Sequence, residues 1–289
     1  NQKILKEKFN IKIISPNFKL EYNLTEAQIM ERLKKLIRYS EPNKNIETLF
    51  IWPEGVFSGY SYEDILFLKE SFNKNFGKNH FILFGINRYD TKKNGLYNTL
   101  IIVDNRLEIL KEYRKQKLVP FGEFLPFEKM LSILGFKKIT EGHGSFLNGS
   151  NQKNIIIGEL NILPLICYEI IFPKLTQKSE DNTNLIVNIS EDGWFGDSIG
   201  PQQHFAKAIF RAIEHNSFIL RSANKGISAI INNKGEVLKK LNPEEAGNIQ
   251  FNVPLIKNKN KNKNDLIFFV LLITYIFIFN IYKKKINEK

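Results

Sequence analysis

Residues 163–169 read LPLICYE, an apolar run typical of a buried β-strand that leads directly into Cys167 and then into two polar side chains. Open α/β sheets place their functional groups at the ends of strands, so this thiol stands at a candidate functional position. Taken alone, a lone Cys after a strand is typical of a small buried apolar side chain. Catalysis would also require a base and a group that stabilises negative charge.

Two other predicted strand ends supply such groups. The apolar residues 48–52 are followed by Glu54, and residues 108–114 are followed by Lys115. A carboxylate beside a thiol can accept its proton, and an ammonium can stabilise both a thiolate and an oxyanion. Each charge alone fits an ordinary protein surface. Because all three groups leave strand ends, we predict an active site formed by Cys167, Glu54 and Lys115.

Strand-like and amphipathic helical patterns alternate along most of the chain, which predicts a layered α/β domain ending near Pro254. The predicted strands are residues 11–14, 48–52, 81–85, 96–103, 108–114, 155–157, 162–166, 185–189, 218–222 and 227–231. The predicted helices are residues 25–39, 61–76 and 201–216. Thr25 and Gln28 fit a capping box at the start of the first helix.

Two segments between these elements are typical of functional loops. Residues 120–149 are rich in Pro and Gly around one apolar patch, which predicts a long loop with a small helix at residues 130–136. Residues 188–198 open from a predicted strand into a polar loop that contains Trp194 and Phe195. This second loop suits a substrate wall, and its alternative is an ordinary turn anchored by aromatic side chains.

The C-terminal region has the pattern of a membrane anchor. Residues 257–264 alternate Lys and Asn and can bury nothing, which predicts a solvated linker. Residues 266–282 contain no charge and would span roughly 25 Å as a helix, close to the ~30 Å hydrocarbon core of a bilayer. The alternative is a buried core helix. Four lysines lie on each side of the segment, so charge does not set its orientation.

Excess positive charge and a single thiol narrow the classes of function. The chain has 42 Lys+Arg against 30 Asp+Glu, a net charge of +12 that favours anionic partners such as acidic lipid. One Cys excludes an intramolecular disulfide and a thiolate-based structural zinc site, and the four His lack metal-ligand spacing. We expect no cofactor, no metal and no nucleic-acid partner. A Cys–His pair that uses His204 or His215 stays open as an alternative.

Several motifs agree in order and spacing with a known group of enzymes. The motifs at residues 52–54, 113–115, 118–123 and 166–169 resemble the Glu/Lys/Cys motifs of the nitrilase (carbon–nitrogen hydrolase) superfamily. More narrowly, residues 118–126, 167–169, 192–201 and 221–224 resemble the apolipoprotein N-acyltransferase family. The resemblance covers about residues 10–253 and the C-terminal anchor.

The resemblance implies a nitrilase-like α-β-β-α sandwich followed by a single C-terminal transmembrane helix. It also implies a location at the bacterial inner membrane with the catalytic domain facing the periplasm. The implied division is a catalytic domain (1–256), a Lys/Asn linker (257–264), a transmembrane helix (265–285) and a tail (286–289). Family members carry further transmembrane helices before this domain, and this chain begins at Asn1, so we expect it to be a truncated form.

The implied reaction moves an acyl chain from a phospholipid to the α-amino group of the S-diacylglyceryl cysteine of an apolipoprotein. Cys167 would form the thioester, Glu54 would act as the general base, and Lys115 would stabilise the tetrahedral oxyanion. The further residues implied are Glu123, Tyr168 and Glu169 in supporting roles and Trp194, Phe195 and Asn224 at the substrate.

This chain departs from the family at three positions. Glu191 replaces an Asn and Lys225 replaces a neutral residue, and both substitutions are expected to add charge near the pocket. Tyr22 is the nearest aromatic residue to the position of an expected Trp. Two other functions stay open. One is an amidase that hydrolyses a small amide through the same three residues. The other is a membrane-anchored binding module in which those residues are structural.

Overall fold

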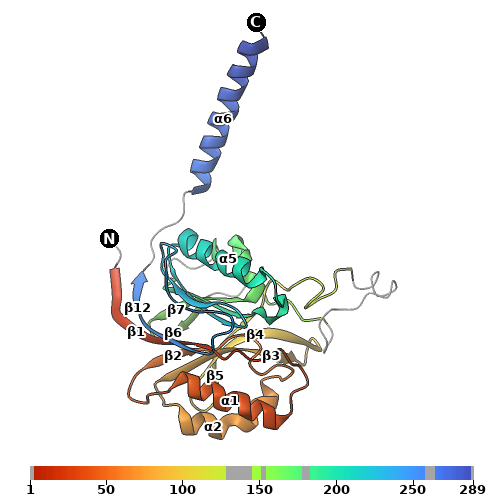
Figure 1. Ribbon diagram of the computed structural model, residues 1–289, viewed down its shortest axis with the longest axis vertical. Helices are drawn as coiled ribbons and strands as arrows, with labels where there is room; N and C mark the ends of the chain where they lie inside the picture. Colours follow the sequence, from red (N-terminus) through yellow and green to blue (C-terminus); the bar gives the residue numbers. More distant parts are fainter. Residues whose placement is uncertain (1–2, 128–144, 151–153, 178–182, 258–263, 288–289) are drawn as a thin grey trace. The chain divides into compact units, whose positions relative to one another are not determined.

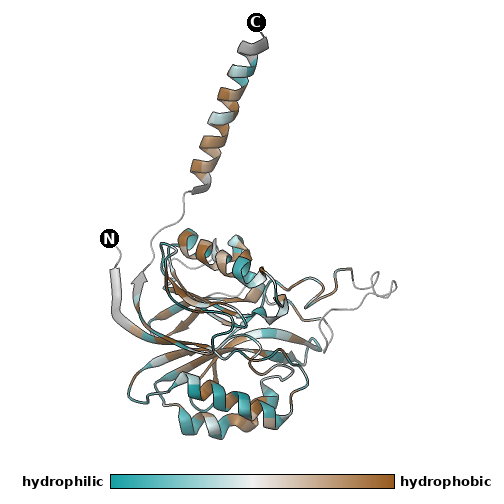
Figure 2. Ribbon diagram, viewed as in Figure 1, coloured by the Kyte–Doolittle hydropathy of each residue, from teal (hydrophilic) through white to brown (hydrophobic). Residues whose placement is uncertain are grey.

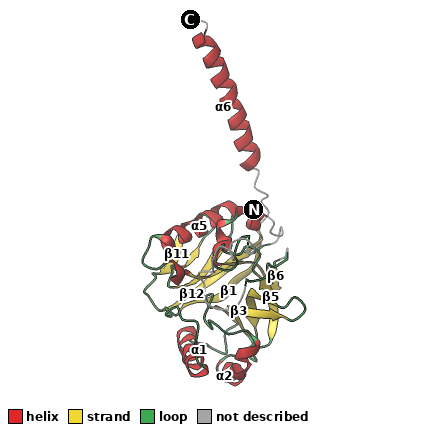
Figure 3. Ribbon diagram, turned by 90° about the vertical axis from the view of Figure 1, so that its right-hand side faces the viewer, coloured by secondary structure: helices red, strands yellow, loops and turns green. Residues whose placement is uncertain are grey.

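The computed structural model describes residues 3–127, 145–150, 154–177, 183–257 and 264–287. The chain separates into two compact units, Asn1–Asn258 and Lys259–Lys289. Among the described residues of the first unit, the strands form two six-stranded sheets. Helices cover the outer face of each sheet, as Figure 1 and the turned view of Figure 3 show.

The first sheet has the strand order β12-β1-β2-β3-β4-β5. Its strands are β1 (Lys3–Ser15), β2 (Thr48–Ile51), β3 (His80–Asp90), β4 (Gly95–Val103), β5 (Ile109–Arg114) and β12 (Gly247–Lys257). The strands β1, β2 and β3 run parallel, whereas β4, β5 and β12 are antiparallel to their neighbours. Because β12 pairs with β1, the two ends of the first unit lie side by side in one sheet (Figure 1).

The second sheet has the strand order β11-β10-β9-β8-β7-β6. Its strands are β6 (Ile155–Ile157), β7 (Leu160–Ile166), β8 (Leu185–Glu191), β9 (Phe218–Asn224), β10 (Ser228–Ile231) and β11 (Val237–Leu241). The central strands β7, β8 and β9 run parallel. Their carboxyl ends therefore meet at one edge of the sheet, where Cys167 follows β7.

The helices form the two outer layers. The first sheet is covered by α1 (Glu26–Ser40) and α2 (Lys69–Asn75), and the second by α4 (Pro173–Gln177) and α5 (Gly200–His215). Three short 3₁₀ turns are η1 (Glu63–Leu68), η2 (Cys167–Ile171) and η3 (Asp192–Phe195). The predicted capping box is present, because the Thr25 and Gln28 side chains each accept from the other's backbone N–H.

Three apolar clusters hold these layers together, and brown stretches of strand lie between the helices in Figure 2. Ile51 and Ile189 belong to the cluster between the two sheets. Leu33 of α1 packs in a second cluster against the first sheet, and Ala208 of α5 packs in a third against the second sheet. The predicted α-β-β-α sandwich is confirmed.

The elements differ from the prediction in two ways. The predicted helix at residues 61–76 is divided into η1 and α2, although its apolar stripe is buried as expected. The strands β11 and β12 were missed, and the first unit ends at Asn258, near the predicted end at Pro254. β12 nevertheless carries apolar side chains at every second position (249, 251, 253 and 255), which is the pattern of a strand.

The second unit contains α6 (Asn264–Asn287). Its segment Leu266–Lys283 is one candidate membrane span among the described residues, with a mean hydropathy of 2.1 and no burial within the structure. Apolar colour covers most of its length in Figure 2. The helix is long and apolar enough to cross a membrane, which fits the predicted single transmembrane helix.

The Trp52 ring provides a test of the first outer layer. It is fully buried, contacts Phe57, Phe72 and Phe84, and donates through Nε1 to Ser40 Oγ at 2.9 Å. We expect Trp52→Ala to lower the free energy of unfolding by about 3–5 kcal/mol because it leaves a cavity in this layer. Denaturant unfolding followed by circular dichroism measures the change.

The only other Trp in the chain gives a matched control. Trp194 is 45% exposed, so Trp194→Ala should change the free energy of unfolding by less than about 1 kcal/mol. Equal losses in the two variants would contradict the packing described for Trp52.

Candidate active site

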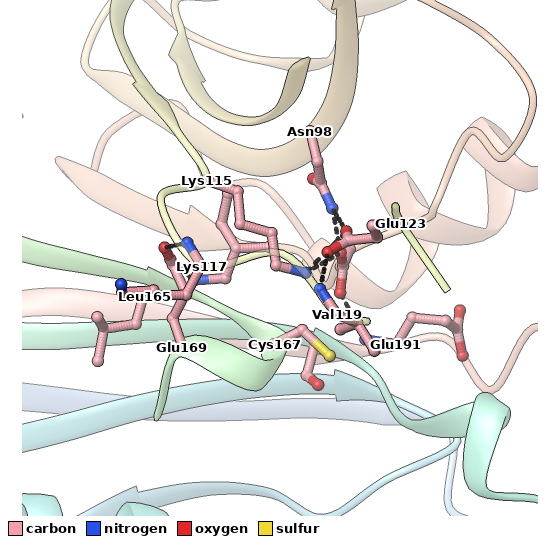
Figure 4. Close-up of polar contacts among 12 residues, drawn as sticks. Asn98, Lys115, Lys117, Val119, Glu123, Leu165, Cys167, Glu169 and Glu191 are labelled. Atoms are coloured by element: carbon pink, nitrogen blue, oxygen red, sulfur yellow. Dashed lines mark hydrogen bonds and ion pairs between the residues drawn. The ribbon is translucent and has the colours of Figure 1, made fainter. Parts of the chain in front are cut away.

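Glu54, Lys115 and Cys167 leave the ends of three strands and meet at one edge of the two sheets. Glu54 follows β2, Lys115 follows β5, and Cys167 follows β7 of the second sheet. The Lys115 ammonium interacts electrostatically with the Glu54 carboxylate and with the Cys167 thiol. Figure 4 shows the Cys167 sulfur beside the tip of Lys115. The structure therefore brings the three predicted residues together.

Lys115 is the most deeply buried charge of this group, with a side chain that is only 1% exposed. Its Nζ lies 2.9 Å from Glu123 Oε1 and 3.7 Å from Glu54 Oε1. Burial alone would lower the pKa of the ammonium, but the carboxylates of Glu123 and Glu54 raise it above its usual value. Lys115 is therefore a fixed positive charge at neutral pH.

Asn98 of β4 was not predicted as a site residue, yet it joins the two carboxylates. Its Nδ2 donates to Glu54 Oε1 at 2.7 Å and to Glu123 Oε1 at 2.8 Å (Figure 4). This amide holds both carboxylates on the same side of the Lys115 ammonium. The available signal was a polar side chain in the middle of an otherwise buried strand.

The Glu54 side chain is also fixed from the second sheet. Its Oε2 accepts from the backbone N–H of Glu191, the last residue of β8, at 3.1 Å. On the neighbouring strand β3, a Cβ at Gly85 would come within 3.0 Å of Glu54 Cα. A residue with a side chain at position 85 would therefore push the carboxylate out of this position.

Cys167 has an unusual backbone conformation, with a φ of 48° in the left-handed region. Its side chain is half-buried, and the Ser190 side chain lowers the pKa of its thiol to a small extent. Burial and the nearby Glu54 carboxylate raise the pKa of the thiol, and the Lys115 ammonium only partly opposes this rise. The resting thiol is therefore protonated, so a nucleophilic sulfur must first lose its proton to a base.

Glu169 links the strand that carries Cys167 to the loop that carries Lys115. Its carboxylate accepts from the backbone N–H groups of Ile166, Gln116 and Lys117 at 2.9, 2.6 and 3.1 Å. The Tyr113 hydroxyl lies 3.0 Å from both of its oxygens. Burial raises the pKa of Glu169 to about 7, against the lowering effect of these backbone donors. This buried carboxyl positions both segments.

The end of the predicted loop at residues 120–149 is attached to the same site. Phe146 N donates to the carbonyl of Glu123 at 2.8 Å, and Gly149 N donates to the carbonyl of Lys115 at 2.7 Å. A Cβ at Gly149 would lie 2.1 Å from the Arg114 carbonyl oxygen, so only glycine fits there. The small helix predicted at residues 130–136 lies outside the described residues.

The other predicted residues have varied surroundings. Tyr168 is half-buried, with its ring 5.1 Å from that of Phe172. Trp194 and Phe195 are 45% and 39% exposed. Asn224 is buried, and its amide bonds the backbone of Phe18 and the carboxyl of Glu191. The substrate-binding roles of Trp194, Phe195 and Asn224 stay predictions.

Glu191 is buried rather than exposed as an added charge. Its Oε1 accepts from Gly193 N at 2.9 Å and its Oε2 from Asn224 Nδ2 at 2.8 Å. Burial raises its pKa to about 8, so the carboxyl is mostly neutral at pH 7. The expected extra negative charge is therefore largely suppressed. Lys225 instead reaches outward, 3.4 Å from Glu244 Oε2.

The alternative base was His204 or His215, and the observed contacts of both rings are to atoms other than the Cys167 sulfur. The Nε2 of His204 lies 3.1 Å from the Cys167 carbonyl oxygen, and the Nδ1 of His215 lies 2.9 Å from Ser217 Oγ. The geometry favours the Glu54 carboxylate over a histidine as the base. Within the described ranges, no group of three His, Cys, Asp or Glu residues could hold a metal ion.

The pKa of Glu191 predicts a pH dependence of stability. The group has a pKa of about 8 in the folded protein and 4.5 in its ordinary state. Its contribution to the free energy of unfolding is therefore fully present below pH 4.5 and is lost as the pH rises through 8. The reason is that the carboxyl ionises at a lower pH in the unfolded chain than in the folded protein. We expect Glu191→Gln, which cannot ionise, to remove part of this fall in the free energy of unfolding.

Denaturant unfolding at a series of pH values from about 5 to about 8 measures the effect. Glu244→Gln is the control, since the Glu244 side chain is 80% exposed and should leave the slope unchanged. An identical slope in wild type and Glu191→Gln would contradict the assignment of a raised pKa to Glu191.

Comparisons with known proteins agree with this geometry. The profile of the carbon–nitrogen hydrolase family matches residues 14–256. The chain is 32% identical over 257 residues to an apolipoprotein N-acyltransferase of Bradyrhizobium diazoefficiens, covering 84% of this chain and 48% of that protein. It is 35% identical over 249 residues to the protein of the same name in Rickettsia typhi, covering 84% and 49%.

Solved structures show the same fold. Nit3 of Saccharomyces cerevisiae, a nitrilase superfamily member, superposes with a TM-score of 0.62 at 18% identity, covering 87% of this chain and 92% of that one. An amidase from Nesterenkonia sp. superposes with a TM-score of 0.62 at 16% identity, covering 91% and 97%. This chain spans about half the length of the curated relatives that it matches over most of its residues. It belongs to the carbon–nitrogen hydrolase family.

Proposed function

We propose that this chain transfers a fatty acyl group from a phospholipid, through a thioester on Cys167, to the α-amino group of an S-diacylglyceryl cysteine at the start of an apolipoprotein. The observation that carries the proposal is the buried Lys115 ammonium, which lies between the Glu54 and Glu123 carboxylates and beside the Cys167 thiol. A thiol, a base and a fixed positive charge are the groups that acyl transfer requires.

In the first half-reaction Glu54 accepts the proton of the Cys167 thiol. The sulfur then attacks the ester carbonyl carbon of the phospholipid, and a C–S bond forms. The C–O bond of the ester breaks, and the departing lysophospholipid oxygen takes the proton from Glu54. Because the raised pKa of the thiol keeps it protonated at rest, this transfer to Glu54 is the step that creates the nucleophile.

In the second half-reaction the neutral α-amine attacks the thioester carbonyl. Glu54 takes a proton from the amine, the C–S bond breaks, and the sulfur recovers a proton to regenerate the thiol. In both halves the Lys115 ammonium stabilises the tetrahedral oxyanion. Lys115 can do so without reorganisation because Glu123 and Glu54 already hold its Nζ in place.

The remaining site residues act by support and contact. Glu123 pairs with Lys115, Glu169 positions the loop of Lys115 relative to β7, and Tyr168, which follows the nucleophile in the chain, packs its ring against Phe172. The exposed rings of Trp194 and Phe195 would contact the substrate. Asn224 would contribute by fixing this edge of the site through Glu191.

The proposed acyl donor is a phospholipid, which is dissolved in a bilayer. The helix α6 would anchor the enzyme in that bilayer. The curated relatives are named apolipoprotein N-acyltransferases, whereas the amidases share only the fold. We place the chain at the bacterial inner membrane with its catalytic domain, residues 1–256, facing the periplasm. Residues 257–264 would link this domain to a transmembrane helix at 265–285, with 286–289 as a tail.

Intact-mass measurement after incubation with phospholipid vesicles tests the thioester directly. Wild type should gain the mass of one fatty acyl group and lose it on treatment with hydroxylamine, and Cys167→Ala should gain nothing. Lys115→Met should slow adduct formation by about 10²–10³-fold because the oxyanion loses its fixed charge. Lys117→Met is the matched control, since this exposed lysine lies two residues away.

Three outcomes would contradict the proposal. A hydroxylamine-sensitive lipid adduct on Cys167→Ala would exclude Cys167 as the nucleophile. Turnover of a soluble amide by wild type, without any adduct from phospholipid, would identify a small-molecule amidase instead. Lipid or peptide binding that Cys167→Ala leaves intact, with no adduct on wild type, would identify a binding module.

A further inference from the structure

A buried polar network that includes neither Lys115 nor Glu54 also contacts Cys167. Its centre is Asp192, the first residue of η3, whose side chain is fully buried. Arg221 of β9 donates to Asp192 Oδ2 at 2.7 Å. Burial would raise the pKa of Asp192, but Arg221 and His204 hold it at about 2, so Asp192 is a carboxylate at neutral pH.

The other oxygen of Asp192 reaches the nucleophile by two routes. Ser190 Oγ donates to Asp192 Oδ1 at 2.6 Å, and the same side chain lowers the pKa of the Cys167 thiol. His204 Nδ1 lies 2.9 Å from Asp192 Oδ1, while its Nε2 lies 3.1 Å from the Cys167 carbonyl oxygen. One carboxylate is thus connected to both the side chain and the backbone of Cys167.

Both ring nitrogens of His204 have polar partners. Nδ1 lies 2.9 Å from Asp192 Oδ1 and 3.1 Å from the Arg221 guanidinium, and Nε2 faces the Cys167 carbonyl oxygen, which can only accept. The ring therefore bridges the Asp192 carboxylate to the Cys167 carbonyl. The bridge is buried, because His204 and Asp192 are 5% and 1% exposed. Buried hydrogen bonds of this kind strongly restrict the orientation of the groups that they join.

We propose that Asp192, His204 and Ser190 are positioning residues that hold Cys167 in its left-handed backbone conformation. A φ of 48° is unfavourable for a residue with a Cβ and persists only where surrounding contacts impose it. The His204 bond to the carbonyl supplies such a contact, and Ser190 connects the same Asp192 carboxylate to the thiol side. The inference rests on the proposed function only in treating Cys167 as the nucleophile.

Two substitutions at His204 separate the two ends of the bridge. In His204→Gln the amide nitrogen takes the place of Nε2 and retains the donor to the Cys167 carbonyl. In His204→Asn the amide nitrogen takes the place of Nδ1, so the donor to Asp192 is kept and the donor to Cys167 is lost. The two variants remove the same imidazole, so a purely structural role for the ring would affect both similarly.

Alkylation by iodoacetamide is the readout, because Cys167 is the only thiol in the chain. The reaction needs no acyl donor, so it tests the positioning network even if the proposed acyl transfer is wrong. We expect His204→Asn to slow alkylation by about tenfold or more, and His204→Gln to remain within about threefold of wild type. Thermal unfolding of each variant corrects the rates for the folded fraction.

Equal alkylation rates in the two variants, whether both normal or both slow, would overturn the proposal. If His204→Asn does not fold, Ser190→Ala takes its place, because it removes the other connection from Asp192 to the thiol. An unchanged rate in folded Ser190→Ala would then overturn the proposal, and a rate about tenfold lower would support it. Slow alkylation of His204→Asn together with no phospholipid adduct on wild type would keep the network and reject the acyltransferase.

Discussion

The burial of the Lys115 ammonium is the constraint on which the site depends. A charge that is 1% exposed is tolerated inside a protein only when it is paired and hydrogen-bonded. Glu123 and Glu54 pair with the ammonium, and the Asn98 amide donates to both carboxylates and so holds them beside it. Folding of the first sheet therefore cannot be completed without assembling the charges that acyl transfer would use.

The second sheet contributes the thiol and holds it from two directions. Glu169 connects the end of β7 to the loop of Lys115, and the Asp192 network connects Cys167 to β9 and α5. The backbone N–H of Glu191 donates to the Glu54 carboxylate, so the base is also held by the second sheet. The apolar cluster between the sheets fixes their separation, which in turn fixes the distance between the thiol and the base.

Sequence reasoning found the residues that leave strand ends and missed those inside strands. Glu54, Lys115 and Cys167 each follow a predicted strand, so their meeting could be predicted from the rule that sites lie at strand ends. Asn98 lies in the middle of β4, where its role depends on partners distant in the sequence. The burial of Glu191 could not be predicted from the sequence either, because it depends on contacts with Asn224 and the η3 turn.

The fold shows the same division between local and distant causes. The Thr25 cap of α1 and the apolar stripe of residues 61–76 are local patterns, and both appear in the structure. The split of that stripe into η1 and α2 and the pairing of β12 with β1 depend on packing against other elements. The α-β-β-α layering followed from the family resemblance, and the order of the strands within each sheet was not predicted.

The most direct test of an acyl-transferring thiol is the fate of a preformed thioester. The acyl form of wild type would be isolated after exposure to phospholipid and then mixed with a peptide that begins with an S-diacylglyceryl cysteine. The account predicts that the peptide gains the acyl group as an amide faster than free fatty acid appears. Release of fatty acid at the same rate with and without the peptide would show that water resolves the thioester, and would contradict the account.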